Sequence, residues 1–260
     1  QALALPLVRR CAQAPWLLQA LGAPAASTLR ALCIGALDID VADGMALTVA
    51  PRDGGGVRLA GGIQALDLAV PASHRLAVAA GHVLLIADGL LPAPSARHVG
   101  IDGRRWADLR IDALDLPPEA VLARGPVVDE AARQVADLAA LATAIEMAAT
   151  LGVTLEHAIA YLLQRQQFGT ALASFQVLRH RVVDLYVDHE CACALLVRIV
   201  SDAVARGAVD GRDASLAKLY LNPLARRAAE VSIQLHGGMG MTAELPATRL
   251  ARRLMVAEFE

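Results

Sequence analysis

The chain has 260 residues, enough for one large domain or two modest domains with packed cores. Its 24 Lys and Arg residues nearly balance 26 Asp and Glu residues, so the composition indicates neither a nucleic-acid partner nor an acidic disordered protein. Hydrophobic residues make up 56% of the chain and aromatic residues only 3%, which favours helices packed closely through Ala, Leu and Val.

The first half of the chain is predicted to hold loops and strands, because ten of the 12 prolines fall at or before Pro126. Residues 1–30 predict a remnant of a helical N-terminal domain, in which the helix APWLLQALG ends at Gly22. Residues 31–124 contain short apolar runs such as GVRLAGG and HVLLIADG, separated by turns, and PRDGGG is a hairpin loop. This spacing predicts an antiparallel β domain, either a barrel or a sandwich.

Residues 125–260 predict an up-and-down helical bundle. The first helix runs to Gly169 and the second stops at Gly207. The third opens with Asp213 or Ser215 as its N-cap and ends at the glycines of QLHGG, and ELPATRL begins a fourth.

Three classes of site or location are disfavoured by the residue pattern. The most apolar stretch, LAALATAIEMAATLGVTL, carries a glutamate and three threonines, which predicts a buried helix rather than a membrane span. The four cysteines lack metal-ligand or disulfide spacing, so we expect no metal and a reducing cytoplasm. The start at Gln1 shows no signal-peptide pattern and suggests a trimmed N-terminus.

The segment RQQFGTALASFQ joins the first two predicted helices. Arg165 can pair with a phosphate through two donors, and Gln176 can both donate and accept hydrogen bonds. The same segment also fits a purely structural role, with Arg165 offsetting the helix dipole, Gly169 ending the helix and Phe168 in the core.

The segment QLHGGMGM has two interpretations of the same kind. Gly237 and Gly238 can simply end the third helix, or they can expose backbone amides to a phosphate. The glycines alone do not decide between a helix stop and a ligand-binding loop.

Taken together, the order of these motifs resembles the C-terminal domain of the acyl-CoA dehydrogenase family. AIAYLLQRQQFG is similar to the helix that leads into the family's R-x-x-F-G motif, and SLAKLYLNPLARRAAEVSIQLHGGMG is similar to the helix before its Q-x-x-G-G motif. WADLRIDALDLPPEAVLARG resembles the link between the family's β domain and helical domain. The resemblance covers most of the chain from about residue 30. It implies an N-terminal helical domain, a central β domain, a C-terminal four-helix bundle and assembly as a tetramer.

The resemblance also implies FAD as cofactor, α,β-desaturation of an acyl-CoA thioester, and electron transfer flavoprotein as electron acceptor. In the family, the two motif loops usually serve an FAD whose ring lies in a neighbouring subunit. Arginine and glycine amides suit a diphosphate, and the flavin supplies the hydride chemistry. The positions that match the family's contacts with the diphosphate and adenosine end are Arg165, Phe168, Gly169, Gln176, Gln234, Gly237 and Gly238.

The catalytic base departs from the family pattern. Most members remove the α-proton with a glutamate in a Tyr-Glu-Gly-Thr-like segment after the glycine loop. Here Glu258 and Glu260 lie close to that place, but neither is followed by Gly-Thr, and the ungapped position falls one residue past Glu260. Other members carry the base on the first helix of the bundle, at a position that corresponds to about Ala139 here. Asp137 and Glu146 lie on the same helix but do not match that position. The catalytic residue therefore stays unassigned.

The sequence of the predicted β domain also departs from the family pattern. Asp67 stands about where the family places a Thr or Ser near the flavin, and a carboxylate there would oppose the negative charge of the reduced ring. ALCIGALDID lacks the family's Thr-Glu-Pro-Gly-Ser-like signature. His74 and His82 fit surface or turn positions better than catalytic ones.

Three interpretations stay open. The chain could be the partner subunit of a heteromeric acyl-CoA dehydrogenase, keeping the loops that reach a neighbour's FAD while its own active site is eroded. It could be an ordinary homotetrameric enzyme whose base lies beyond Glu260. It could also be a flavin-free scaffold subunit that keeps the fold for assembly alone.

Overall fold

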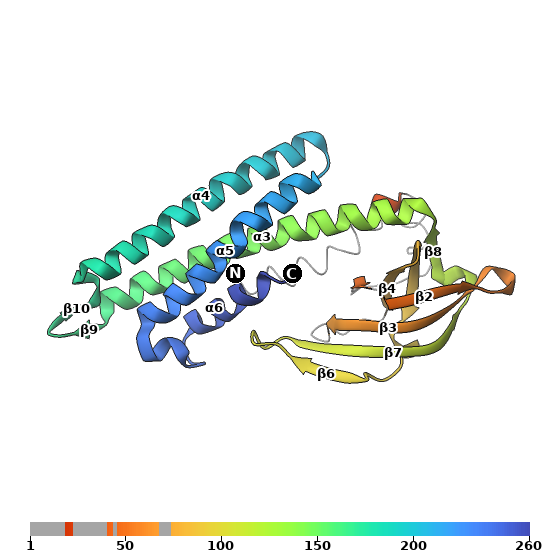
Figure 1. Ribbon diagram of the computed structural model, residues 1–260, viewed down its shortest axis with the longest axis horizontal. Coiled ribbons are helices and arrows are strands. Elements are labelled where there is room, and N and C mark those ends of the chain that lie inside the picture. Colours follow the sequence, from red (N-terminus) through yellow and green to blue (C-terminus); the bar gives the residue numbers. More distant parts are fainter. Residues whose placement is uncertain (1–18, 23–40, 44–45, 68–73) are drawn as a thin grey trace. The chain divides into compact units, whose positions relative to one another are not determined.

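The structure, a computed structural model, describes residues 19–22, 41–43, 46–67 and 74–260 (Figure 1). The chain divides into two compact units between Ala136 and Asp137, inside one long helix. The predicted N-terminal helical remnant lies outside the described residues apart from 19–22, and so does ALCIGALDID. The predicted domain boundaries after residues 30 and 124 stay predictions.

The β unit contains two four-stranded sheets. The first has the strand order β1 (Val41–Asp43), β4 (His74–Ala79), β5 (His82–Ala87) and β8 (Val121–Arg124). The second has the order β2 (Ala46–Pro51), β3 (Val57–Asp67), β7 (Arg105–Leu116) and β6 (Ala96–Val99). The hairpin predicted at PRDGGG is confirmed, because β2 and β3 pair antiparallel on either side of it.

The alternation of side chains along the strands explains how the two sheets pack. Ala77 and Leu84 on the first sheet share a buried core with Leu59 and Ile63 on the second. Because successive strand residues point to opposite faces, Leu76 and its neighbours form a second core on the other face of the first sheet. The β unit is therefore a sandwich, and the barrel alternative does not apply to the described strands.

One strand pair differs from the antiparallel expectation. Val41–Asp43 pairs parallel with β4, whereas every other strand pair of the described chain is antiparallel. The chain forms β2 and β3 of the other sheet between these two strands, so β1 and β4 are joined by a crossover rather than by a tight turn.

The helical unit is a four-helix bundle. Its helices are α3 (Pro126–Gln164), α4 (Gln176–Arg206), α5 (Gly211–His236) and α6 (Pro246–Ala257). Figure 1 shows α5 between α4 and α6, and α5 presents a column of small side chains to the core. This column is almost fully buried and comprises Ala214, Ala217, Ala225, Ala228 and Ala229.

The helix boundaries show which local signals decided the fold. Gly207 ends α4 in the left-handed conformation with φ 72°, as predicted. The first helix ends at Gln164 rather than Gly169, because the next residues form a small hairpin of β9 (Gln166–Gln167) and β10 (Thr170–Ala171). The N-cap of α5 is Asp210, whose side chain accepts from the Arg212 amide, so the predicted caps at Asp213 and Ser215 are wrong.

Helix α3 is long and apolar enough to span a membrane, and it alone passes that test among the described residues. However, 56% of its most apolar window is buried inside the protein. Its Met147, Leu151 and Leu155 side chains lie in the bundle core. These contacts explain the apolar stretch, because it forms a helix in the core of the bundle.

Candidate functional site

The structure brings the two motif loops together at one end of the bundle (Figure 1). The β9–β10 hairpin follows α3, and the glycine loop, a 3-10 turn at Gly237–Met241, follows α5. A small apolar core of Ala158, Leu162 and Leu235 lies beneath both loops, with Leu172 of the hairpin segment packed against it. The loops are about 70 residues apart in the chain, and this shared core brings the helices that carry them together at the same end of the bundle.

The hairpin presents its functional groups outward. The Leu172 amide donates to the Arg165 carbonyl at 2.8 Å and closes the loop. At the tip, Phe168 has φ 54°, which is rare for a side-chain-bearing residue, and its ring is 92% exposed. The ring contacts Phe175 edge-on, with centroids 6.2 Å apart. Phe168 is therefore a protruding residue, and its alternative assignment to the core is wrong.

Arg165 and Gln176 lie on either side of this tip, and both are exposed. Gln176 is the first residue of α4, and no side chain caps that helix start at Phe175. Uncapped amides at a helix N-terminus favour an anion. Within the described part of the chain, no ion pair or hydrogen bond engages the Arg165 guanidinium.

The three glycines of the second loop differ in whether the backbone conformation or the surrounding space requires glycine at that position. Gly237 adopts φ 59° and ψ −139°, a conformation that side-chain-bearing residues rarely adopt. A Cβ on Gly240 would lie 2.5 Å from the Ile233 carbonyl oxygen, so this residue lets the loop fold back on α5. Gly238 has neither a positive φ nor a neighbour within 4 Å of a Cβ. The fold thus explains Gly237 and Gly240 but leaves Gly238 as bare, exposed backbone.

This donor set fits the diphosphate end of a dinucleotide. It combines a guanidinium, two side-chain amides, an uncapped helix start and an open backbone segment. Gln234 contributes the second amide and is exposed in the last turn of α5. Such groups bind phosphate oxygens through charge-assisted hydrogen bonds.

The glutamates considered as catalytic bases are all engaged by arginines. Glu258 accepts from Arg226 on α5, with contacts of 2.6 to 3.0 Å. Glu260 accepts from Arg253 on α6 at 2.8 and 3.0 Å. The buried Glu146 on α3 binds the same Arg253, with one contact of 2.9 Å.

Arg253 therefore lies between two carboxylates inside the bundle. Burial lowers the pKa of its guanidinium, but the hydrogen bonds that it donates to Glu146 and Glu260 outweigh that effect and raise the pKa above its ordinary value. Its side chain is only 7% exposed. A carboxylate held in this way is not a free proton acceptor.

The remaining candidates take structural positions. The Ala139 carbonyl accepts from Thr143, and the Asp137 carboxylate packs beside Gly211 at the start of α5. His82 bonds the Ala80 carbonyl through Nδ1 at 2.7 Å in the β4–β5 turn. Asp67 ends β3 opposite Trp106. No group of three His, Cys, Asp or Glu side chains is arranged for a metal among the described residues.

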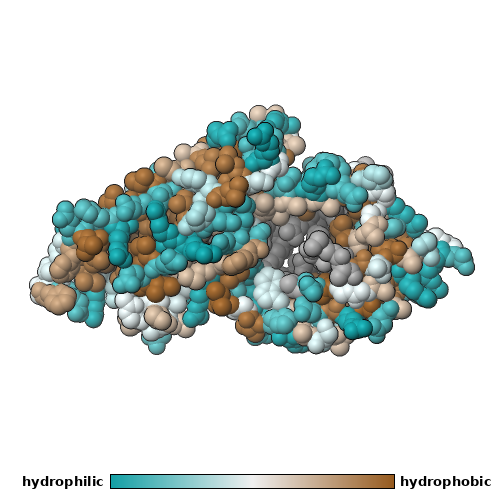
Figure 2. All heavy atoms as spheres, viewed as in Figure 1, coloured by the Kyte–Doolittle hydropathy of each residue, from teal (hydrophilic) through white to brown (hydrophobic). Residues whose placement is uncertain are grey.

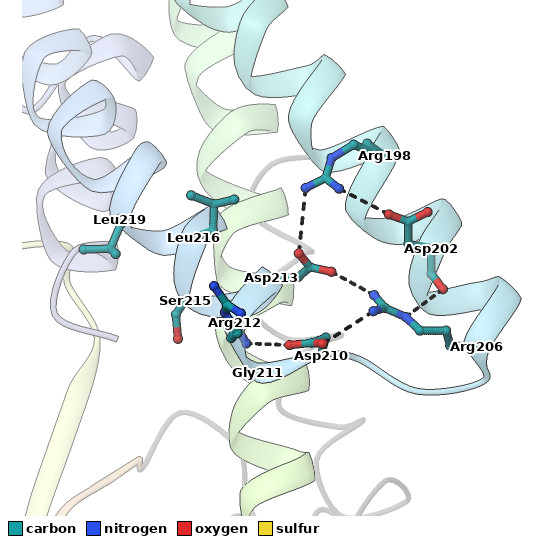
Figure 3. Close-up of a pocket in the computed structure, with 10 residues that line it drawn as sticks. All are labelled: Arg198, Asp202, Arg206, Asp210, Gly211, Arg212, Asp213, Ser215, Leu216 and Leu219. Carbon is teal, nitrogen blue, oxygen red and sulfur yellow. Dashed lines mark hydrogen bonds and ion pairs between the residues drawn. The ribbon is translucent and has the colours of Figure 1, made fainter.

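A hollow at the turn between α4 and α5 is lined by residues that form ion pairs with one another (Figure 3). Asp213 bridges Arg198 at 3.7 Å and Arg206 at 2.8 Å, and Arg206 also reaches Asp210 at 3.5 Å. These contacts close the helix hairpin. Sequence analysis did not identify this cluster, nor a contact between Tyr161 and His236 beside the motif loops. The available signal was position, because Tyr161 is one helical turn before Arg165 and His236 directly precedes Gly237.

Comparison with solved structures defines the class of fold. The Tcur3481-Tcur3483 steroid ACAD variant is 26% identical with a TM-score of 0.72, covering 86% of this chain and 63% of that chain. Butyryl-CoA dehydrogenase from Megasphaera elsdenii is 21% identical with a TM-score of 0.73, covering 83% of this chain and 59% of that chain. The chain has the fold of the acyl-CoA dehydrogenases.

Sequence comparison shows the family. The acyl-CoA dehydrogenase C-terminal domain matches residues 130–260. The chain belongs to the acyl-CoA dehydrogenase family, whose members are FAD-dependent oxidoreductases. An acyl-CoA dehydrogenase from Bacillus subtilis is 27% identical over 191 residues, 74% of this chain and 50% of that protein. Acyl-CoA dehydrogenase IpdE2 from Mycolicibacterium smegmatis is 35% identical over 109 residues, 42% of this chain and 33% of that protein. The chain thus spans half or less of these relatives.

Proposed function

We propose that this chain is a subunit of an FAD-dependent acyl-CoA dehydrogenase that completes an FAD site at a subunit interface without supplying the catalytic carboxylate. Arg165, Gln176, Gln234 and the amides near Gly238 would hold the diphosphate and adenosine end. When bound, FAD supplies the hydride-accepting chemistry of α,β-desaturation of an acyl-CoA thioester.

One contrast carries this proposal. The side chains suited to a diphosphate are exposed and available at the bundle end, whereas Glu146, Glu258 and Glu260 are all bound to arginines. A general base must be free to accept the substrate proton. The chain is therefore better equipped to bind the cofactor than to remove a proton.

Exposed apolar side chains support assembly with another chain. Hydrophobic atoms recur along α4 on the face shown in Figure 2. The exposed members repeat at helical spacing, and they are Val183, Tyr186, Val187, Val197, Val200 and Val204. A stripe of this length at the surface is typical of an interaction face. We propose that it packs against a second acyl-CoA dehydrogenase-like chain in a tetramer.

The electron acceptor is proposed from likeness to a relative, and the cellular location from the cysteines. One relative is the caffeyl-CoA reductase-Etf complex subunit CarC of Acetobacterium woodii, 25% identical over 168 residues. This supports electron transfer flavoprotein as the acceptor for the present chain. We also propose a cytoplasmic location, in keeping with the free thiols at Cys191 and Cys193.

The test is the ratio of flavin to polypeptide in the assembled protein. The chain would be co-expressed with a neighbouring dehydrogenase-like chain, and FAD would be counted by absorbance against total protein. We expect about one FAD for every two chains, as the interface arrangement requires. One flavin per chain in a complex of this chain alone would instead support a homotetramer, and an assembly without flavin would support a scaffold.

A further inference from the structure

The hydroxyl of Tyr161 joins the ends of two bundle helices. Tyr161 lies in the last turn of α3, and its Oη donates to the carbonyl oxygen of His236 at 3.3 Å. His236 is the final residue of α5. The last carbonyls of a helix have no donor within the helix, so Tyr161 supplies one that α5 lacks. The two rings are also in contact, with centroids 4.6 Å apart and an interplanar angle of 39°.

Each of the two residues stands directly beside one motif loop. The Arg165 amide donates to the Tyr161 carbonyl at 2.8 Å, which is the last helical bond before the hairpin. His236 precedes Gly237 and is only 4% exposed. Its Nδ1 donates to the Ser232 carbonyl at 2.8 Å, which holds the ring against its own helix. The Tyr161–His236 contact is thus a direct link between the hairpin and the glycine loop.

The link fixes the peptide from which the glycine loop starts. The carbonyl of the His236–Gly237 peptide is bound by Tyr161, and its N–H donates to the Gln234 carbonyl. Both polar groups of this peptide are therefore held, and the chain then leaves α5 through the unusual conformation of Gly237. Rotation of this peptide would change the direction of the amides that follow, including that of Gly238.

We infer that Tyr161 is a positioning residue that couples the two cofactor loops, so that each loop keeps the geometry the other needs. This inference rests on the proposed FAD role of Arg165 and Gly238. Under this inference Tyr161 need not contact the cofactor itself. It acts through the His236 carbonyl on one side and through the end of α3 on the other.

The test replaces the hydroxyl alone with Tyr161→Phe in the full-length protein in its assembled state. The matched control is Tyr220→Phe in the middle of α5, where the side chain is 36% exposed and its hydroxyl interacts with Cys191 rather than with either loop. Amide hydrogen exchange of the flavin-free protein would be followed at residues 166–172 and 237–241. Amides of α3 around Met147 and Leu151 would report on global stability.

We expect Tyr161→Phe to speed exchange in both loops by a similar factor, about three- to tenfold, the change expected for one lost hydrogen bond. Exchange around Met147 should stay unchanged, and Tyr220→Phe should alter none of these segments. The Kd for FAD, from titration of the flavin-free assembly, should rise about three- to tenfold. The KM for acyl-CoA should not change in proportion.

The outcomes separate the two proposals. Faster exchange in only one loop, or in neither, would overturn the coupling. Faster exchange in both loops with an unchanged Kd for FAD would support the coupling but overturn the positioning role in cofactor binding. If the wild-type assembly takes up no FAD, the proposed function fails, and the exchange data alone still decide whether Tyr161 couples the loops.

Discussion

Arg253 on α6 and Glu146 on α3 form a buried ion pair across 107 residues of sequence, with Nη2 2.9 Å from Oε2. Their side chains are 7% and 3% exposed. The remaining donors of Arg253 bind Glu260, so one guanidinium orders the end of α6 against the first bundle helix. The stability of a buried charge network of this kind depends on every member being present, because each buried charge needs its partner.

Replacing Arg253 with methionine should strongly destabilise the bundle. Arg253→Met leaves Glu146 buried without its partner, and the free energy of unfolding should fall by about 3–5 kcal/mol. Urea unfolding followed by circular dichroism measures this change. The control is Arg226→Met, which breaks an ion pair whose arginine is 54% exposed and should change stability far less. Equal losses of unfolding free energy in the two variants would show that the buried ion pair contributes no more to stability than the exposed one.

Arg165→Ala should weaken FAD binding while leaving the fold intact. Loss of a charge-assisted contact with the diphosphate should raise the Kd for FAD by about tenfold or more. Fluorescence titration of the flavin-free assembly measures the Kd. Arg212→Ala is the matched control, because this exposed arginine lies at the start of α5 whereas the glycine loop follows the end of that helix, and it should leave the Kd unchanged. Unaltered flavin content in Arg165→Ala would remove Arg165 from the site.

Two adjacent glycines should give opposite results. Gly237→Ala forces a side chain into φ 59° and ψ −139°, and it should lower the free energy of unfolding by about 1–3 kcal/mol without flavin. Gly238→Ala has open space and ordinary φ, so stability should hold while FAD binding weakens. Thermal unfolding and FAD titration on both variants separate the effects. A stability loss at Gly238→Ala would assign this glycine to the fold instead.

The thiol of Cys193 should react slowly at neutral pH. Burial and then the nearby Glu190 carboxylate raise the pKa of this thiol above its ordinary value, so the thiolate fraction at neutral pH is smaller than that of an ordinary thiol. Iodoacetamide labelling with peptide mass spectrometry should modify the exposed Cys191 first, and the Cys193 rate should climb as pH rises. Glu190→Gln should speed Cys193 labelling at a given pH. Labelling of both cysteines at equal rates at pH 7 would contradict this expectation.

Local chemistry made much of the bundle predictable. Gly207 ends α4 and Gly237 follows α5, because a glycine after an apolar helical pattern permits the backbone turn that stops a helix. The N-cap of α5 was misplaced because Asp210, Asp213 and Ser215 are all good capping residues within six positions. Only the backbone geometry selects Asp210 among them.

Long-range relationships carried no such local signal. Nothing near Glu146 in the sequence indicates a partner at Arg253, and the link between Tyr161 and His236 likewise depends on how α3 and α5 pack. The hairpin after Gln164 was also missed, since RQQFG continues the helical pattern in composition while its Phe168 takes a positive φ. The seven predicted cofactor residues stay a prediction, although they gather at one end of the bundle.

The alanine column of α5 has a consequence for how this protein can change. Ala217, Ala225 and Ala228 are fully buried, and an alanine side chain has little to lose on truncation. Enlargement, by contrast, would push α5 away from its neighbours and strain a close-packed interior. A saturation-mutagenesis survey should therefore find this column tolerant of glycine and serine but closed to leucine, isoleucine and phenylalanine. Amino-acid substitutions accepted at these positions would then be confined to a narrow range of side-chain volumes.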